Sequence, residues 1–117
     1  MKTVLVIISQ GPLAGQNLLE ALSATLVLAT FGLELKVCFK DDAIHLLKPP
    51  QLSEQTPHNF KLAYGMVESF EFYDLFPVLV TTNSDSQHEL LTLSPLEHQV
   101  INIDNVLLNQ FDQVLYW

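Results

Sequence analysis

The sequence predicts a three-layer α/β/α domain built on a mainly parallel five-stranded sheet, flavodoxin-like in outline. Its first forty residues read as one βαβ unit, with an apolar strand over Thr3–Ile8, a long apolar helix and a second strand ending at Phe39. Parallel neighbours require such helical crossovers. Strand and helix patterns then alternate to the end of the chain, which favours the α/β class. A length of 117 residues fits a single domain, residues 1–117, with one core.

The first strand and helix establish this pattern. Thr3–Ile8 is a continuous apolar run, typical of a central strand that is covered on both faces. Gly11 and Pro12 turn the chain, and a helix over about 13–30 carries leucines at spacings of three and four residues. Gly32 follows at the position where a left-handed C-terminal cap is common.

The second strand, Leu33–Phe39, alternates strictly between apolar and other side chains, which predicts one buried face and one partly covered face. Cys38 falls on the second face, so we expect it to be less buried than either neighbour along the strand. Asp41 and Asp42 are the predicted N-cap and first-turn charge of a short helix over 43–47.

The later elements follow from shorter patterns and their flanking turn residues. Proline at position 77 is compatible with a strand only near its start or on an unpaired side. The predicted elements are a helix over about His58–Phe70 that begins after Pro57, a strand over Leu75–Thr82, a helix over about Gln87–Leu93, a strand over Val100–Ile103, a helix from the Asp104 cap to about Asn109, and a strand over Val114–Trp117.

Composition narrows the class of protein. Apolar residues make up 49 % of the chain and charged residues 15 %, which excludes disorder and indicates an apolar surplus that a partner should cover. No run reaches the roughly 20 apolar residues that a membrane-spanning helix needs. The start of the chain passes directly into a strand without a cleavage site, so we expect no signal peptide and a cytoplasmic protein without membrane attachment.

Charge and cysteine content exclude further classes. Five basic residues, all lysine, stand against 13 acidic residues, and the net charge is -8. Direct nucleic-acid binding normally needs clustered basic side chains, so any work on RNA would fall to another subunit. The chain has one cysteine, which excludes an internal disulfide.

Function in a parallel sheet is expected at the carboxyl ends of the strands. The loops after Ile8, Phe39, Val80 and Ile103 should therefore carry it. Hydroxyl groups gather at Thr81–Ser84, but no histidine or lysine is placed nearby along the sequence to activate one. We expect these residues to cap the next helix.

Cys38 is the one candidate nucleophile and stands at the carboxyl end of the second strand. Lys36 and Lys40 on the same face would lower its pKa, whereas Asp41 and Asp42 would raise it. A structural role is favoured, and a reactive thiol that carries a persulfide remains the alternative.

Metal and cofactor sites lack their usual signatures. The four histidines, at positions 45, 58, 88 and 98, show no metal-binding spacing. The turn Gln10–Gly15 lacks the G-x-G-x-x-G pattern, and its proline removes a donor that a phosphate would need. We expect neither a metal nor a cofactor, with a small-ligand or nucleotide module as the alternative. Trp117, after an edge-like strand, is assigned to an interface.

Several segments are similar to the TusC/DsrF branch of the DsrE-like sulfur-relay family, in an order and spacing that cover nearly the whole chain. They are Gly11-Pro12 leading into Ala14-Gly15 and Leu18-Leu19-Glu20-Ala21-Leu22-Ser23-Ala24, then Phe39-Lys40-Asp41-Asp42-Ala43-Ile44-His45-Leu46-Leu47, Tyr73-Asp74, and Phe111-Asp112-Gln113-Val114-Leu115.

The resemblance implies a DsrE-like fold and a heterohexamer with two copies each of this chain and two sister subunits, one TusB-like and one TusD-like. In the Tus system the complex passes a persulfide from an upstream to a downstream carrier, towards 2-thiouridine at the wobble position of certain tRNAs. The related Dsr assembly serves sulfur oxidation. The family's sulfur-accepting cysteine follows the third strand of the DsrE/TusD subunit, where this chain reads Val80-Thr81-Thr82-Asn83.

The resemblance therefore implies a non-catalytic subunit of a cytoplasmic sulfur-relay complex that supports tRNA modification. The alternatives are a subunit of a DsrEFH-like sulfur-oxidation complex and a stand-alone sulfurtransferase that uses Cys38.

Overall fold

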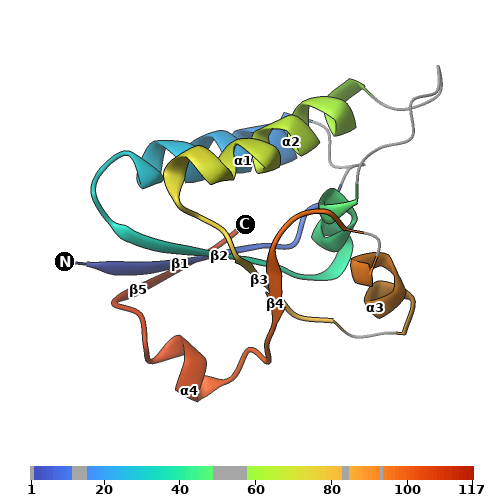
Figure 1. The fold of residues 1–117 in the computed structure, drawn as a ribbon. Coiled ribbons are helices and arrows are strands. Elements are labelled where there is room, and N and C mark those ends of the chain that lie inside the picture. Colours follow the sequence, from blue (N-terminus) through green and yellow to red (C-terminus); the bar gives the residue numbers. More distant parts are fainter. Residues whose placement is uncertain (1, 12–15, 49–57, 83–84, 93) are drawn as a thin grey trace.

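The computed structural model describes residues 2–11, 16–48, 58–82, 85–92 and 94–117. Predictions that fall on Pro12, on the start of the first helix before residue 16, on Pro57 and on Asn83–Ser84 lie outside this part. Figure 1 shows the elements, where η marks a 3-10 helix: β1 Thr3–Ile8, α1 Gln16–Ala29, β2 Glu34–Phe39, η2 Asp41–Leu47, α2 His58–Glu68, η3 Ser69–Tyr73, β3 Val78–Val80, α3 Asp85–Thr92, β4 His98–Val100, α4 Asn105–Leu108 and β5 Gln113–Tyr116.

The five strands form one sheet in the order β4-β3-β2-β1-β5, and every neighbouring pair is parallel. This confirms the predicted parallel five-stranded sheet. The order differs from the 2-1-3-4-5 order of flavodoxin, so the likeness to that fold is one of outline.

Helices cover the two faces of the sheet unequally. In Figure 1, α1 and α2 lie side by side over one face, and α4 lies alone on the opposite side. Right-handed crossovers explain this arrangement. The chain moves in one direction across the sheet from β1 to β4, and returns past all of them to β5, so the return segment must pass over the other face.

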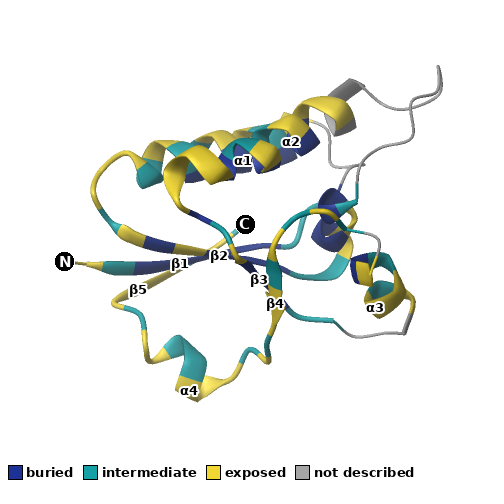
Figure 2. Ribbon diagram, in the orientation of Figure 1, coloured by how far each residue is buried: buried dark blue, intermediate teal, exposed yellow. Residues whose placement is uncertain are grey.

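The larger part of the core lies beneath α1 and α2 (Figure 2). Alternate residues of β1 and β2, such as Val6 and Val37, face this side, and the rings of Phe39 and Phe70 stack with centroids 6.3 Å apart. On the other face a smaller cluster of four buried residues contacts partly buried side chains of the return segment. The four are Leu5, Ile7, Cys38 and Leu79, and the covering side chains are Ile101, Ile103, Leu108 and Phe111.

The third strand is shorter than predicted, and the fourth begins and ends earlier in the sequence than predicted. The third strand covers Val78–Val80 instead of Leu75–Thr82, and the fourth covers His98–Val100 instead of Val100–Ile103. β3 and β4 pair with each other over three residues, from Val78 with His98 to Val80 with Val100. After β4 the chain leaves the ladder and packs Ile101 and Ile103 on the second face. Pro77 precedes β3, so its missing N–H removes no ladder bond.

The predicted N-cap at Asp41–Asp42 is wrong. The segment is a 3-10 helix, η2, that already begins at Asp41, and the residue before it, Lys40, makes no side-chain cap. The turn is instead closed by the Ala43 N–H, which donates to the Lys40 carbonyl at 3.1 Å. Burial of Ile44 and Leu47 holds this turn against the core.

Two other caps are confirmed. Gly32 adopts a φ of 74°, the left-handed conformation expected after α1. Asp104 caps α4, since its Oδ1 accepts from the Leu107 N–H at 2.9 Å.

The edge strand β5 is attached to β1 at both ends. At its start the Thr3 N–H donates to Asp112 Oδ2 at 2.9 Å, and these hydrogen bonds from Thr3 hold the pKa of Asp112 below its usual value. At its end the Trp117 N–H donates to the Ile7 carbonyl at 2.8 Å. The predicted fifth strand is thereby confirmed. In the part of the chain that is described, no helix is long and apolar enough to cross a membrane.

Replacing Gly11 by alanine should destabilise the fold, because the added Cβ would lie 2.5 Å from Asp42 Cβ and 2.8 Å from its carbonyl oxygen. We expect a loss of about 1–3 kcal/mol in the free energy of unfolding, measured by urea denaturation. Gly65→Ala is the matched control, since nothing lies within 4 Å of its Cβ, and helix propensity predicts a gain of about 0.5–1 kcal/mol. Equal stability of the two variants would contradict the close contact at Gly11.

Candidate functional site at the carboxyl ends of the strands

A cavity of about 320 Å³ opens at the carboxyl edge of the sheet. It is lined by side chains from the segments that follow β2, β3 and β4: Lys40, Asp41, Thr81, Thr82, Asn102 and Ile103. Two of the loops at which the sequence analysis expects function, those after Phe39 and Val80, meet at this cavity. The third segment contains Asn102 and Ile103, which the sequence analysis assigned to a strand and which follow β4 in the structure. The loop after β1 holds Gln10, which lines a different cavity with Trp117.

Strand register explains why these residues meet. Phe39 of β2 is paired with Val80 of β3, so the residues that follow leave the sheet side by side. The Thr81 N–H donates to the Phe39 carbonyl at 3.1 Å, and the Ile101 N–H donates to the Val80 carbonyl at 2.8 Å. Three chain segments therefore leave the sheet at one place, and their polar side chains gather at its edge.

Lys40 provides a positive charge at this cavity. Its Nζ lies 3.8 Å from Asp41 Oδ2 and 5.4 Å from the centre of the Tyr116 ring. The hydrogen bond to Tyr116 is the main cause that raises the pKa of Lys40. The ammonium group is therefore held in its charged form between an aromatic ring and a carboxylate.

Thr82 has a histidine partner that the sequence analysis did not find. Thr82 Oγ1 lies 2.9 Å from His88 Nε2, so the expectation that no histidine is near these hydroxyls is wrong. His88 belongs to α3, which follows β3 along the chain, and its side chain lies beside Thr82 at the end of β3. Depending on the tautomer, the imidazole either donates to the Thr82 hydroxyl or accepts from it.

Cys38 is completely buried, with 0 % of its surface exposed, as are its neighbours Val37 and Phe39. The expectation that it is less buried than these residues is wrong, because the segment that includes Ile101 and Ile103 packs over this part of the second face. Burial raises the pKa of the thiol to about 12, and the charge of Lys40 opposes this only in part. At neutral pH the sulfur is therefore a protonated, shielded group.

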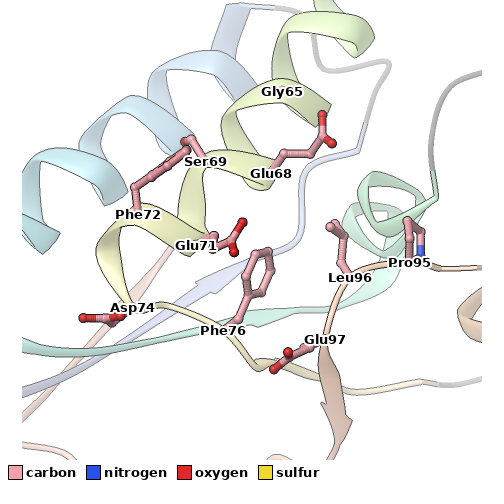
Figure 3. Close-up of a pocket in the computed structure, with 10 residues that line it drawn as sticks. All are labelled: Gly65, Glu68, Ser69, Glu71, Phe72, Asp74, Phe76, Pro95, Leu96 and Glu97. Atoms are coloured by element: carbon pink, nitrogen blue, oxygen red, sulfur yellow. The ribbon is translucent and has the colours of Figure 1, made fainter.

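A larger cavity of about 650 Å³ lies away from this edge, between the α2–η3 segment and the chain that enters β4 (Figure 3). Glu68, Glu71 and Asp74 line one side, Glu97 lies opposite, and Phe76 is placed between them. None of the described residues that line it is basic. The sequence analysis did not find this cavity, because its carboxylates come from separate elements and share no motif.

Among the described residues, no group of three or more histidine, cysteine, aspartate or glutamate side chains could hold a metal ion. Trp117 is half-buried and packs against the larger core cluster. Its assignment to an interface stays a prediction. Tyr116, Val106 and Phe72 are more exposed, at 57 %, 71 % and 84 %.

Comparison with known proteins identifies the fold. No family model and no curated protein matches the sequence. Among solved structures, the chain is similar to the ychN protein from E. coli, with a TM-score of 0.66, 21 % sequence identity and coverage of 100 % of both chains. The chain therefore has a DsrE-like α/β fold, and the likeness extends over its whole length.

The Cys38 thiol should be almost inert in the folded protein. A pKa moved from 9.0 to about 12 lowers the thiolate fraction at pH 8 by about 1,000-fold, and burial adds a steric barrier. Alkylation by iodoacetamide, followed by mass spectrometry, should be at least that much slower in the native protein than in urea. Comparable rates in the two states would show that the thiol is accessible.

Cys38 should also make the protein less stable at alkaline pH. The unfolded thiol loses its proton near 9.0, whereas the folded thiol keeps it until about 12, so stability falls between these values. The expected slope is about 1.4 kcal/mol per pH unit. Urea denaturation at several pH values should show this slope as a difference between the wild type and Cys38→Val, which share all other titrating groups. Parallel curves for the two proteins would refute the raised pKa.

Proposed function

We propose that this chain is a non-catalytic subunit of a sulfur-relay complex, in which a cysteine of a sister subunit carries the persulfide. One observation carries the proposal: the single cysteine of the chain, Cys38, is completely buried and has a raised pKa. A persulfide carrier must expose its sulfur to a donor and then to an acceptor, as a thiolate that can attack. Cys38 meets neither requirement in the folded state.

The carboxyl end of β3 supports the same reading. The sequence resemblance puts the sulfur-accepting cysteine of the sister subunit after this strand. Here Thr81 and Thr82 stand there and line the carboxyl-edge cavity. A threonine hydroxyl cannot hold a persulfide sulfur, so a DsrE-like chain with threonine at this position contributes structure or contacts instead of transfer.

Exposed apolar side chains support membership of a complex. Phe31, Phe72 and Val106 are each more than two thirds exposed, at 68 %, 84 % and 71 %. Large exposed apolar groups on a small domain are typical of surfaces that a partner covers. The proposed partners are a TusB-like and a TusD-like subunit in a heterohexamer, with upstream and downstream sulfur carriers that dock on the assembly.

We assign the complex to the cytoplasm and to 2-thiouridine formation at the wobble position of tRNA. The net charge of -8 makes this subunit a poor surface for RNA, so the RNA would be handled elsewhere in the pathway. A DsrEFH-like complex for sulfur oxidation is the second candidate, because it uses the same kind of assembly.

Native mass spectrometry of the tagged protein, purified from its own host at normal expression, tests the assembly. Two further small subunits should co-elute in equal ratio with this chain. A lone chain or a homo-oligomer would contradict the proposal. Loss of tRNA 2-thiouridine on deletion would assign the complex to tRNA thiolation, whereas an unchanged level would favour the sulfur-oxidation candidate.

The substitution Cys38→Ser should leave sulfur transfer unchanged, because the thiol takes no part in it. The measurement is the tRNA 2-thiouridine level in a strain that carries the variant, with Cys38→Val as a second variant that removes the polar group from the buried site. Native mass spectrometry controls for an intact complex.

The stand-alone sulfurtransferase predicts the opposite result. The wild-type chain, incubated with a cysteine desulfurase, relay carriers and cysteine, would then gain the mass of one sulfur atom on Cys38. Appearance of that adduct on the folded chain would overturn the non-catalytic assignment.

A further inference from the structure

We propose that the carboxyl-edge cavity binds a small oxyanion of the phosphate or sulfate type. In this site Lys40 supplies the charge, Thr81, Thr82 and Asn102 supply hydrogen-bond donors, and the Asp41 carboxylate competes with the ligand for Lys40. The inference goes beyond the proposed function and does not depend on it, since it uses none of the sulfur chemistry.

The size and place of the cavity fit a small ligand. Parallel α/β sheets bind ligands at the carboxyl ends of their strands, and this cavity is formed there by three separate segments. Its volume of about 320 Å³ lies at the lower limit of the range of about 300–1,000 Å³ that small-molecule sites occupy. A tetrahedral oxyanion fits this space better than a nucleotide does.

The lining is rich in donors. An ammonium group offers three N–H donors, an asparagine amide offers two, and each threonine hydroxyl offers one. Hydrogen bonds from an ammonium group to an oxyanion are the strong, charge-assisted kind. Lys40 is also restricted in position, because its Nζ lies 5.4 Å from the centre of the Tyr116 ring and 3.8 Å from Asp41 Oδ2. The charge is therefore held at the edge of the cavity.

The contact between Thr82 and His88 allows the hydroxyl to serve as a donor. When the Nε2 atom carries the proton, the imidazole donates to Thr82 Oγ1 across 2.9 Å. The hydroxyl proton of Thr82 is then available to the cavity. A bound oxyanion would favour this arrangement over the tautomer in which Thr82 donates to the histidine.

Asp41 decides the sign of the ligand charge. It is the one carboxylate among the described residues that line the cavity, and it already lies 3.8 Å from Lys40 Nζ. A cation would be repelled by Lys40, and the Asp41 carboxylate is already engaged with that lysine. An anion, in contrast, can replace Asp41 beside the Lys40 ammonium group. Asp41 also has a φ of 52°, in the region that L side chains rarely adopt, and such backbone strain is frequent beside functional sites.

Thermal denaturation with inorganic phosphate tests the proposal, in chloride buffers matched for ionic strength. A ligand that binds only the native state raises Tm with its concentration, and the fit of that rise gives the apparent Kd. The proteins are the wild type, Lys40→Met, Asp41→Asn and the matched control Lys36→Met. Lys36 is an exposed lysine of the same strand region that does not line the cavity.

Wild type and Lys36→Met should show the same rise from phosphate binding, and Lys40→Met should lose this contribution. Asp41→Asn should bind phosphate about fivefold more tightly, because one opposing charge at contact distance is removed. Phosphate also stabilises proteins in general through exclusion from their surfaces, and this effect is common to all four proteins. Binding at the cavity is therefore measured as the difference in the rise of Tm between the wild type and Lys40→Met. An equal rise in the wild type and Lys40→Met, or no rise in any of the four proteins, would overturn the proposal.

Amide chemical shifts give a second measurement in case Lys40→Met disturbs the fold. Titration of the wild type with phosphate should move the backbone signals of Thr81, Thr82 and Asn102 along saturable curves. Thr82→Val, which keeps the side-chain shape and removes the donor, should weaken binding several-fold. Shifts confined to other lysines, such as Lys48 or Lys61, would rule out this cavity as the site.

Discussion

The right-handed crossover between parallel strands is the constraint on which the rest of this structure depends. Because β2, β3 and β4 follow β1 in one direction across the sheet, the connections with α1 and α2 lie on a single face and build the larger core there. The chain must then return over the opposite face to add β5 beside β1. That return segment contains α4, a helix of four residues, so the second face receives a much thinner cover.

The return segment also decides the chemistry of the cysteine. Cys38 and Lys40 lie two residues apart on the second face, but Cys38 lies within β2 under the isoleucines of the return segment, and Lys40 lies just beyond the strand. The thiol is therefore desolvated and protonated, while the ammonium group reaches the cavity and keeps its charge. The fold thus buries the thiol of Cys38, the candidate nucleophile, and places the ammonium group of Lys40 at the cavity.

The two cavities differ in charge and in surroundings. The carboxyl-edge cavity combines Lys40 with hydroxyl and amide donors, whereas the larger cavity beside α2 and η3 combines four carboxylates with aromatic rings. The chain has a net charge of -8. The larger cavity is acidic like the chain as a whole, whereas the carboxyl-edge cavity contains a lysine. The two cavities therefore offer surfaces of different character to any ligand.

The sequence by itself determined the order of the five strands and of the α-helices between them, the caps at Gly32 and Asp104, and the edge of the sheet at which polar residues meet. These features depend on side-chain periodicity and on contacts within a few residues, which a local pattern records. Tertiary structure decided the short extent of β3 and β4, the burial of Cys38 and the contact of Thr82 with His88. Each of these depends on which distant segment packs against the residue, and the neighbouring sequence does not specify that segment.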